Sequence, residues 1–168
     1  ATEVDLLYWT AASWAAAIAL GKDDPSLVAD LPLVSALIDR ALAVDADWDR
    51  GAIHSFLVTY EMARPDVVGS FDDRVTSARK HFDQAITLSQ GKAAGPYVSW
   101  AESVCLPRDD RACFQEMLQA AMSINPDDHP ATRLANMIFQ RRAAWLLANV
   151  DRWILPPLDE TEAREEQP

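Results

Sequence analysis

The sequence contains few of the residues and motifs on which most enzyme active sites are built. Glycine occurs only five times in 168 residues, and there is no glycine-rich phosphate loop and no Gly-x-Ser-x-Gly turn. Nucleotide binding and nucleophilic hydrolysis therefore have no visible site in this chain. His54, His81 and His129 lack the spacing of metal ligands, and no His-Glu-x-x-His or paired-cysteine motif is present. We therefore predict a protein that is not an enzyme and that uses no cofactor and no metal.

One short segment begins like a calcium-binding loop and then departs from the pattern. Asp45, Asp47 and Asp49 have the spacing of the first ligands. The position that requires glycine is Arg50, and the position of the closing bidentate glutamate is Phe56. We interpret the segment as a loop between two helices, with aspartates that cap the second helix.

Positive charge and long apolar segments are also scarce. The chain has 15 Lys and Arg against 26 Asp and Glu, a formal net charge of −11, so we expect no nucleic-acid partner. No apolar run approaches the roughly 20 residues that span a bilayer, and the first helix, with Asp5 and Thr10, does not resemble a signal segment. Five of the acidic residues lie in the last ten positions. We predict one domain over residues 1–155 and an acidic, disordered tail over 156–168.

What the chain does have is a helical pattern that occurs three times, at residues 34–46, 78–89 and 114–126. Apolar residues recur in it with a period near 3.6, and one position is always small, namely Ala41, Ala85 and Ala121. A small residue suits a point where two helix backbones approach closely. Repeats of a few tens of residues are typical of stacked helical hairpins. We therefore predict an all-α fold of antiparallel helical hairpins, stacked as a short tetratricopeptide-like (TPR-like) array.

Prolines, glycines and capping residues divide the chain into about seven main helices. We expect them near residues 4–20, 32–44, 51–63, 70–89, 96–107, 109–125 and 130–153. Ser70 with Asp73 forms a predicted capping box, and Asp109 is the expected cap of the sixth helix. In such arrays the first helix of each hairpin lines the concave face, so we expect a functional groove along the first, third, fifth and seventh helices.

This groove is expected to combine aromatic and charged side chains. Arg141 falls on an apolar stripe of the last helix, where burial requires a carboxylate, and Glu102 is the preferred partner. The pair is either a structural ion pair or a polar patch that orients the charged end of a ligand. The six tryptophans either fill the core or line an apolar pocket. The predicted groove residues are Trp14, His54, Glu61, Trp100, Glu102, Arg141 and Trp145; the stripe consists of Leu134, Ile138, Trp145 and Ala148.

The two cysteines lie on either side of one short turn. Cys105 closes the fifth helix, and Cys113 lies one turn into the sixth. In an antiparallel hairpin these positions face each other, so a disulfide is geometrically possible in an oxidising compartment. Two buried free thiols are the alternative.

An ordered set of short motifs carries a family resemblance. The motifs are Tyr8-Trp9, Asp23-Asp24-Pro25, Arg40-Ala41-Leu42, Gly51-Ala52-Ile53-His54, His81-Phe82, Gly91-Lys92 and, above all, Arg133-Leu134-Ala135-Asn136 followed by Gln140-Arg141-Arg142-Ala143 and Trp145-Leu146-Leu147. Together they resemble the T-component family of tripartite ATP-independent periplasmic (TRAP) transporters, over nearly the whole chain to about Trp153. The resemblance implies a periplasmic accessory protein of TPR-like hairpins, usually a lipoprotein, anchored through a removed N-terminal segment. It also implies assembly with the solute-binding P-component, a homo-oligomer (a trimer in the described case), and a groove for a hydrophobic ligand.

We therefore predict a non-enzymatic scaffold that docks a periplasmic solute-binding protein. In this interpretation the groove holds a small hydrophobic or amphipathic organic acid that is passed to a membrane permease. One alternative is a stand-alone carrier of a hydrophobic small molecule, and another is an enzyme with an unrecognised site.

Overall fold

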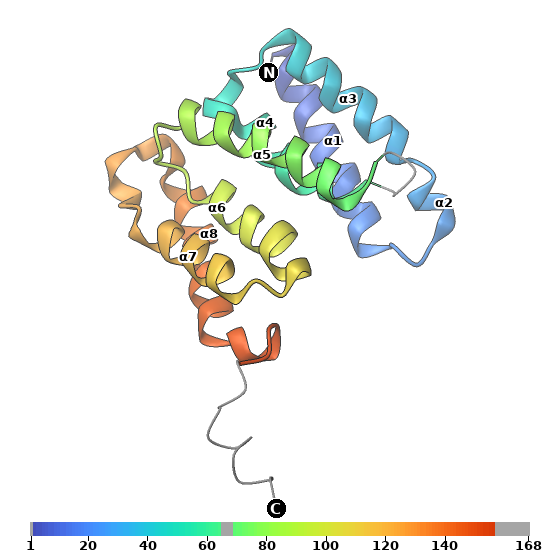
Figure 1. Ribbon diagram of the computed structural model, residues 1–168. Helices are drawn as coiled ribbons and strands as arrows, with labels where there is room; N and C mark the ends of the chain where they lie inside the picture. Colours follow the sequence, from blue (N-terminus) through green and yellow to red (C-terminus); the bar gives the residue numbers. More distant parts are fainter. Residues whose placement is uncertain (1, 65–68, 157–168) are drawn as a thin grey trace, which may run out of the picture.

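The computed structural model describes residues 2–64 and 69–156, and within these ranges it contains helices and no β-strand (Figure 1). The main helices are α1 (Glu3–Leu20), α3 (Leu31–Val44), α4 (Trp48–Ala63), α5 (Phe71–Leu88), α6 (Gly95–Trp100), α7 (Arg111–Ser123) and α8 (Arg133–Ala148). One short turn, α2 (Pro25–Val28), precedes α3. The predicted all-α class with about seven main helices is confirmed. Residues 157–168, which make up nearly all of the predicted tail, lie outside the described residues.

Side-chain caps set several of the helix starts. The predicted capping box of Ser70 and Asp73 opens α5, and each residue accepts a hydrogen bond from the backbone N–H of the other. The predicted cap of α7 is wrong by one residue. Asp110 is the cap, because its carboxylate accepts a hydrogen bond from the Cys113 N–H at 2.9 Å. Asp109 instead has a left-handed backbone, with φ of 52°.

Helices that follow one another in the chain pack as hairpins. α1 lies against α3, and α4 lies against α5. α6 continues into a π-helical segment (Ala101–Cys105), packs against α7 and, like α7, contacts α8. Figure 1 shows α1 and α3 at one end of the molecule, α4 and α5 in the middle, and α6 to α8 at the other end. The TPR-like geometry of this stack stays a prediction.

The buried apolar residues form two clusters that meet at α4. One cluster joins α1, α3 and α4, with Ile53 as a member from α4; the other joins α4 to α5 through α8, with Val58 as its member. The repeated alanines Ala41, Ala85 and Ala121 are all buried, as expected where helices approach closely. α4 is therefore the helix through which the two halves of the molecule are joined.

The predicted buried stripe of the last helix is wrong. Its four members, Leu134, Ile138, Trp145 and Ala148, are all exposed. The buried residues of α8 are Asn136, Ala143 and Leu146. Since α8 carries apolar residues on more than one side, periodicity alone does not identify the side that packs against α6 and α7.

Candidate functional site

A cleft runs along the inner side of α1, between this helix and α4, α6 and α8. Its volume is about 660 Å³, which lies in the usual range for ligand pockets. The α1 wall is made mainly of alanines, which leave space because they have no side chain beyond Cβ. The other walls are mostly apolar, with Phe56 and Tyr60 from α4, Ser99 from α6 and Phe139 from α8. These four helices are the first, third, fifth and seventh of the main helices, the set expected to line the groove.

A second cavity of about 320 Å³ adjoins the first one. Tyr8, Ser55 and Phe139 line both cavities, so the two lie side by side. The second cavity differs in its charge, because Arg50 and Lys92 line it. We define the two cavities together as the inner cleft. Its larger part is apolar, and its smaller part, which Asp49 also lines, carries two cations.

Arg50, which lines the smaller cavity, lies in a strained turn of the backbone. Asp49, Arg50 and Gly51 have φ values of 42°, 58° and 88°, so three consecutive residues at the start of α4 are left-handed. Left-handed backbone costs a residue other than glycine roughly 1–2 kcal/mol. Such strain persists only where the surrounding structure holds it. Here, a Cβ on Gly51 would lie 3.2 Å from both the Cα of Ala85 and the Cβ of Leu88, so α5 packs directly against the turn.

A buried asparagine holds the loop that carries Lys92. Asn136 of α8 is 2% exposed. Its side-chain oxygen accepts a hydrogen bond from the Ala94 N–H at 2.9 Å, and its side-chain amide donates one to the Lys92 carbonyl at 2.9 Å. Asn136 therefore fixes the loop between α5 and α6, because a buried amide that lost these partners would be strongly unfavourable.

Tyr8, which lines both cavities, belongs to a cluster of aromatic residues. Tyr8 of α1 packs against Trp48, with ring centroids 4.7 Å apart, and against Trp9 at 5.2 Å. Trp48 donates a hydrogen bond from its indole N–H to Asp5 at 3.0 Å, which joins the start of α4 to α1. Burial raises the pKa of the Tyr8 phenol, and the Asp49 carboxylate raises it further. The Tyr8 phenol therefore keeps its proton at neutral pH.

The seven predicted groove residues do not line the inner cleft. Glu102 has an arginine partner on α8, but it is Arg142, whose Nη2 lies 2.6 Å from the carboxylate. The predicted pairing of Glu102 with Arg141 is therefore wrong, and Arg141 is exposed. Residues 141 and 142 differ by about 100° around a helix, so an error of one position changes the face. Trp145 packs at the surface against Trp153, with centroids 5.9 Å apart.

The other four predicted residues lie at four separate places. His54 of α4 is buried against α5, and its Nδ1 lies 2.9 Å from the Nδ1 of His81. Glu61 forms an ion pair with Arg64 at 3.1 Å, near the end of the same helix. Trp100 is 8% exposed and belongs to the larger core cluster. Trp14 lies on the outer side of α1 and is described next.

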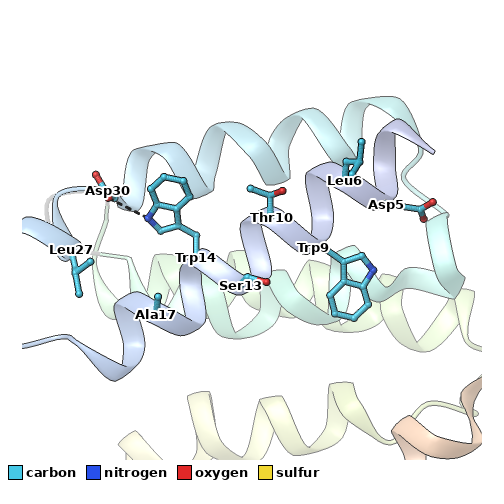
Figure 2. Close-up of a pocket in the computed structure, with 9 residues that line it drawn as sticks. All are labelled: Asp5, Leu6, Trp9, Thr10, Ser13, Trp14, Ala17, Leu27 and Asp30. Atoms are coloured by element: carbon cyan, nitrogen blue, oxygen red, sulfur yellow. Dashed lines mark hydrogen bonds between the residues drawn. The ribbon is translucent and has the colours of Figure 1, made fainter. Parts of the chain in front are cut away.

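The outer side of α1 has a shallow, open depression (Figure 2). Leu6, Trp9 and Trp14 line it, and the Trp14 indole N–H donates a hydrogen bond to Asp30 at 3.2 Å. Trp9 is 61% exposed and Leu6 64%. α1 therefore presents apolar residues to solvent as well as to the inner cleft, which explains why its spacing led to the assignment of Trp14 to the wrong side.

Sequence reasoning missed the residues that distinguish the inner cleft. Arg50 had been considered only as a departure from a calcium loop, and Lys92 only as part of a motif. One usable signal was the alanine-rich segment of α1, because a helix with many small residues leaves room beside it. Its members that line the cleft are Ala12, Ala15, Ala16 and Ala19.

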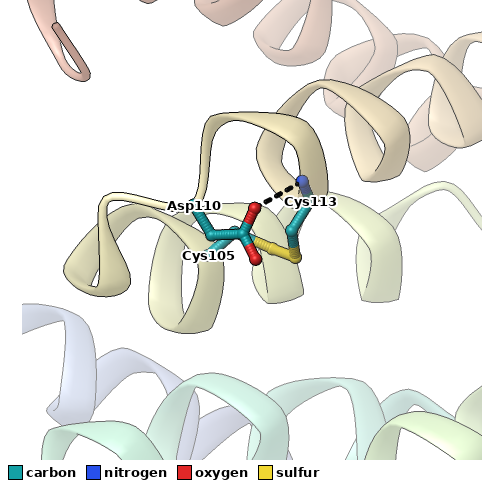
Figure 3. The surroundings of a disulfide bond; sticks show 3 residues. All are labelled: Cys105, Asp110 and Cys113. Atoms are coloured by element: carbon teal, nitrogen blue, oxygen red, sulfur yellow. Dashed lines mark hydrogen bonds between the residues drawn. A yellow bond between two sulfur atoms is a disulfide. The ribbon is translucent and has the colours of Figure 1, made fainter. Parts of the chain in front are cut away.

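A disulfide joins Cys105 to Cys113 (Figure 3). It links the end of the π-helical segment after α6 to the first turn of α7, beside the Asp110 cap. The bridge lies in the larger core cluster, away from the residues that line the inner cleft.

Within residues 2–64 and 69–156, no three His, Cys, Asp or Glu side chains lie close enough together to hold a metal ion. Over the same part of the chain, no helix is both long and apolar enough to cross a bilayer.

Comparison with known proteins identifies one family and one curated relative. The family model described as TRAP transporter T-component matches residues 1–153. An uncharacterized protein of Treponema pallidum (strain Nichols) is 27% identical over 153 residues, which cover 91% of this chain and 46% of the relative. The chain therefore spans about half the length of the curated relative that it matches.

Proposed function

This chain belongs to the TRAP transporter T-component family, and from that premise we propose that it is a non-enzymatic accessory protein of a periplasmic solute transporter. It docks the solute-binding P-component and holds a hydrophobic or amphipathic organic acid in the inner cleft. The family membership supports the association with a TRAP system. The position of the protein in the periplasm, any lipid anchor and its assembly as a trimer are parts of the same proposal.

The inner cleft is the observation that supports a role in ligand binding. Its larger part has about 660 Å³ of space and mostly apolar walls, so an apolar molecule that enters it loses contact with water. The walls come from α1, α4, α6 and α8, with Val28 of α2 and Leu31 of α3, all in one chain. A ligand in this position would be shielded while the protein is bound to its partner.

Two neighbouring alanines provide a matched test of the ligand site. Ala16 lines the inner cleft, whereas Ala17 lines the depression on the outer side of α1. We expect Ala16→Leu to weaken the binding of decanol at least tenfold, because the larger side chain fills the cleft. Ala17→Leu adds the same side chain to the other face and should leave binding unchanged. Equal effects of the two substitutions, measured by native mass spectrometry or titration calorimetry, would contradict the assignment of the cleft.

A stand-alone carrier of a hydrophobic molecule is the second candidate. The cleft favours it in one respect, since the residues that line it belong to one chain. The two candidates differ in whether the purified protein captures the solute-binding protein of the same transporter. Capture with a measurable affinity supports the accessory role, whereas ligand binding without capture supports the carrier.

For the docking surface we propose the exposed side of α8. It carries Leu134, which is 71% exposed, Ile138, which is 57% exposed, and Trp145. α8 has three arginines and no acidic residue, in a chain with a net charge of −11. Tryptophan and arginine are the residue types most often found at the centres of protein interfaces. The surface therefore suits a solute-binding protein with an apolar patch surrounded by acidic side chains.

A further inference from the structure

We propose that the inner cleft recognises the acid group of its ligand, with a carboxylate held between Arg50 and Lys92 and an unbranched apolar chain lying along α1. This inference rests on the proposed ligand-binding function, and it adds the chemical class, the orientation and the residues that select it. Three features support it: the charge of the smaller cavity, the fixed backbone at the two cations and the shape of the larger cavity.

The first step is the charge of the smaller cavity. Arg50 and Lys92 line it together with one acidic residue, Asp49. Among the side chains that the structure describes, neither cation has an ion-pair partner. Several arginines elsewhere are paired with carboxylates, for example Arg40 with Glu3. Positive charge without an ion-pair partner beside a cavity attracts an anion, although the net charge of −11 on the whole chain opposes this attraction.

The second step is the fixed position of both cations. Arg50 projects from the left-handed turn at the start of α4, which packs against α5 through Gly51. Lys92 belongs to the loop that Asn136 holds to α8, and the Lys92 N–H also donates a hydrogen bond to the Ser89 carbonyl at 3.0 Å. The backbones that carry the two charges are therefore held in place before a ligand arrives, which lowers the entropy lost on binding.

The third step is the shape of the apolar part. Beyond the shared residues, the larger cavity follows α1 from Tyr8 to Ala19 and reaches Lys22 just after the helix ends. The eleven helical steps from Tyr8 to Ala19 correspond to roughly 16 Å. A long wall made mainly of alanines suits an unbranched chain. The acid group would then lie near Tyr8, whose neutral phenol is a possible hydrogen-bond donor at the boundary of the two cavities.

The orientation also depends on Lys22, the one charged side chain among the described residues that line the larger cavity. A single cation at the far end of the cleft would support the opposite orientation. We assign the acid group to the Arg50 end because two cations, Arg50 and Lys92, line the cavity there.

The test compares the binding of decanoate and decanol, which have the same chain and differ in charge. We expect the wild-type protein to bind decanoate roughly tenfold to a hundredfold more tightly than decanol at neutral pH, the range for hydrogen bonds to charged groups. We expect the preference to weaken as salt is added. The variant Arg50→Asn/Lys92→Gln should lose the preference and still bind decanol. Asparagine is chosen at position 50 because it tolerates left-handed backbone. Lys92→Gln alone is a second variant, in which we expect a partial loss of the preference for decanoate.

Two charge-matched controls complete the design. Lys22→Gln removes the cation at the other end of the cleft, and Arg141→Gln removes an exposed cation outside it. Both should keep the preference for decanoate. Loss of the preference in Lys22→Gln, or its persistence in Arg50→Asn/Lys92→Gln, overturns the assignment of the acid group while the cleft remains an apolar site. Failure of the wild-type protein to bind either probe overturns the ligand-binding part of the proposed function as well.

Discussion

At the scale of single residues, His54 and His81 form a contact that depends on their protonation. Their Nδ1 atoms lie 2.9 Å apart, a distance at which one nitrogen donates and the other accepts. Burial lowers the pKa of His54, and the His81 imidazole lowers it further, whereas the Asp47 carboxylate raises it. Burial likewise lowers the pKa of His81, and the Lys80 ammonium lowers it further, whereas the Asp39 carboxylate raises it. The neutral pair is therefore the form that the folded protein prefers.

The first prediction is a loss of stability in mild acid. As the pH falls below about 6.5, the unfolded chain takes up protons before the folded protein does, so the free energy of unfolding decreases. The slope is at most about 1.4 kcal/mol per pH unit for each histidine. His54→Gln/His81→Gln should reduce this slope in denaturant unfolding between pH 7 and pH 5. His129→Gln serves as the control, and an unchanged slope in the double variant would refute the role of the pair.

The second prediction separates two neighbouring arginines. Arg142 pairs with Glu102 and lies over the Trp145 ring, with the guanidinium carbon 4.8 Å from the centroid. Because the pair is partly exposed, we expect Arg142→Gln to lower the free energy of unfolding by about 1 kcal/mol or less. Arg141→Gln should have no measurable effect, since Arg141 is exposed. A double-mutant cycle with Glu102→Gln checks the assignment, and coupling of Glu102 to residue 141 would contradict it.

At the scale of the elements, the left-handed start of α4 is sensitive to substitution. Gly51 and Gly91 both have positive φ, 88° and 70°, but only at Gly51 would an added Cβ meet other atoms within 4 Å. Both alanine variants bear the backbone cost of roughly 1–2 kcal/mol. We therefore expect Gly51→Ala to destabilise the protein more than Gly91→Ala does, in chemical unfolding at neutral pH. Equal losses of stability in the two variants would mean that α5 moves away from the added Cβ at no cost in free energy.

The helices themselves were largely predictable, and their orientation was not. Proline, glycine and capping residues act locally, so Ser70 and Asp73 could be assigned from the sequence. The side of a helix that is buried depends on its neighbours. α1 and α8 carry apolar residues on more than one side, and for this reason Trp14 and Arg141 were both assigned to the wrong surface. Arg50 could not be placed at all, because the left-handed backbone that positions it results from packing against α5.

At the scale of the whole molecule, the arrangement of the stack separates two kinds of apolar surface. Between α1 and α8, Tyr8 and Phe139 border a half-open cleft, which suits a small molecule. On the outside, α8 presents an open surface that includes Ile138 and Trp145, which suits another protein. α4 joins the two core clusters and also carries Arg50. A change at the start of α4 is therefore able to affect the ligand site without touching the outer side of α8.

This separation leads to the last prediction, which concerns partner binding. We expect Ile138→Ala/Trp145→Ala to weaken capture of the solute-binding protein at least tenfold, because truncation of central interface residues costs about 2 kcal/mol or more. Both side chains are substantially exposed, so the free energy of unfolding should change by about 1 kcal/mol or less. Binding of decanol in the inner cleft should be unchanged. Leu20→Ala on α1, at a side chain that is 91% exposed, is the matched control. If Leu20→Ala weakens capture and the α8 variant does not, the partner docks at the α1 end of the molecule.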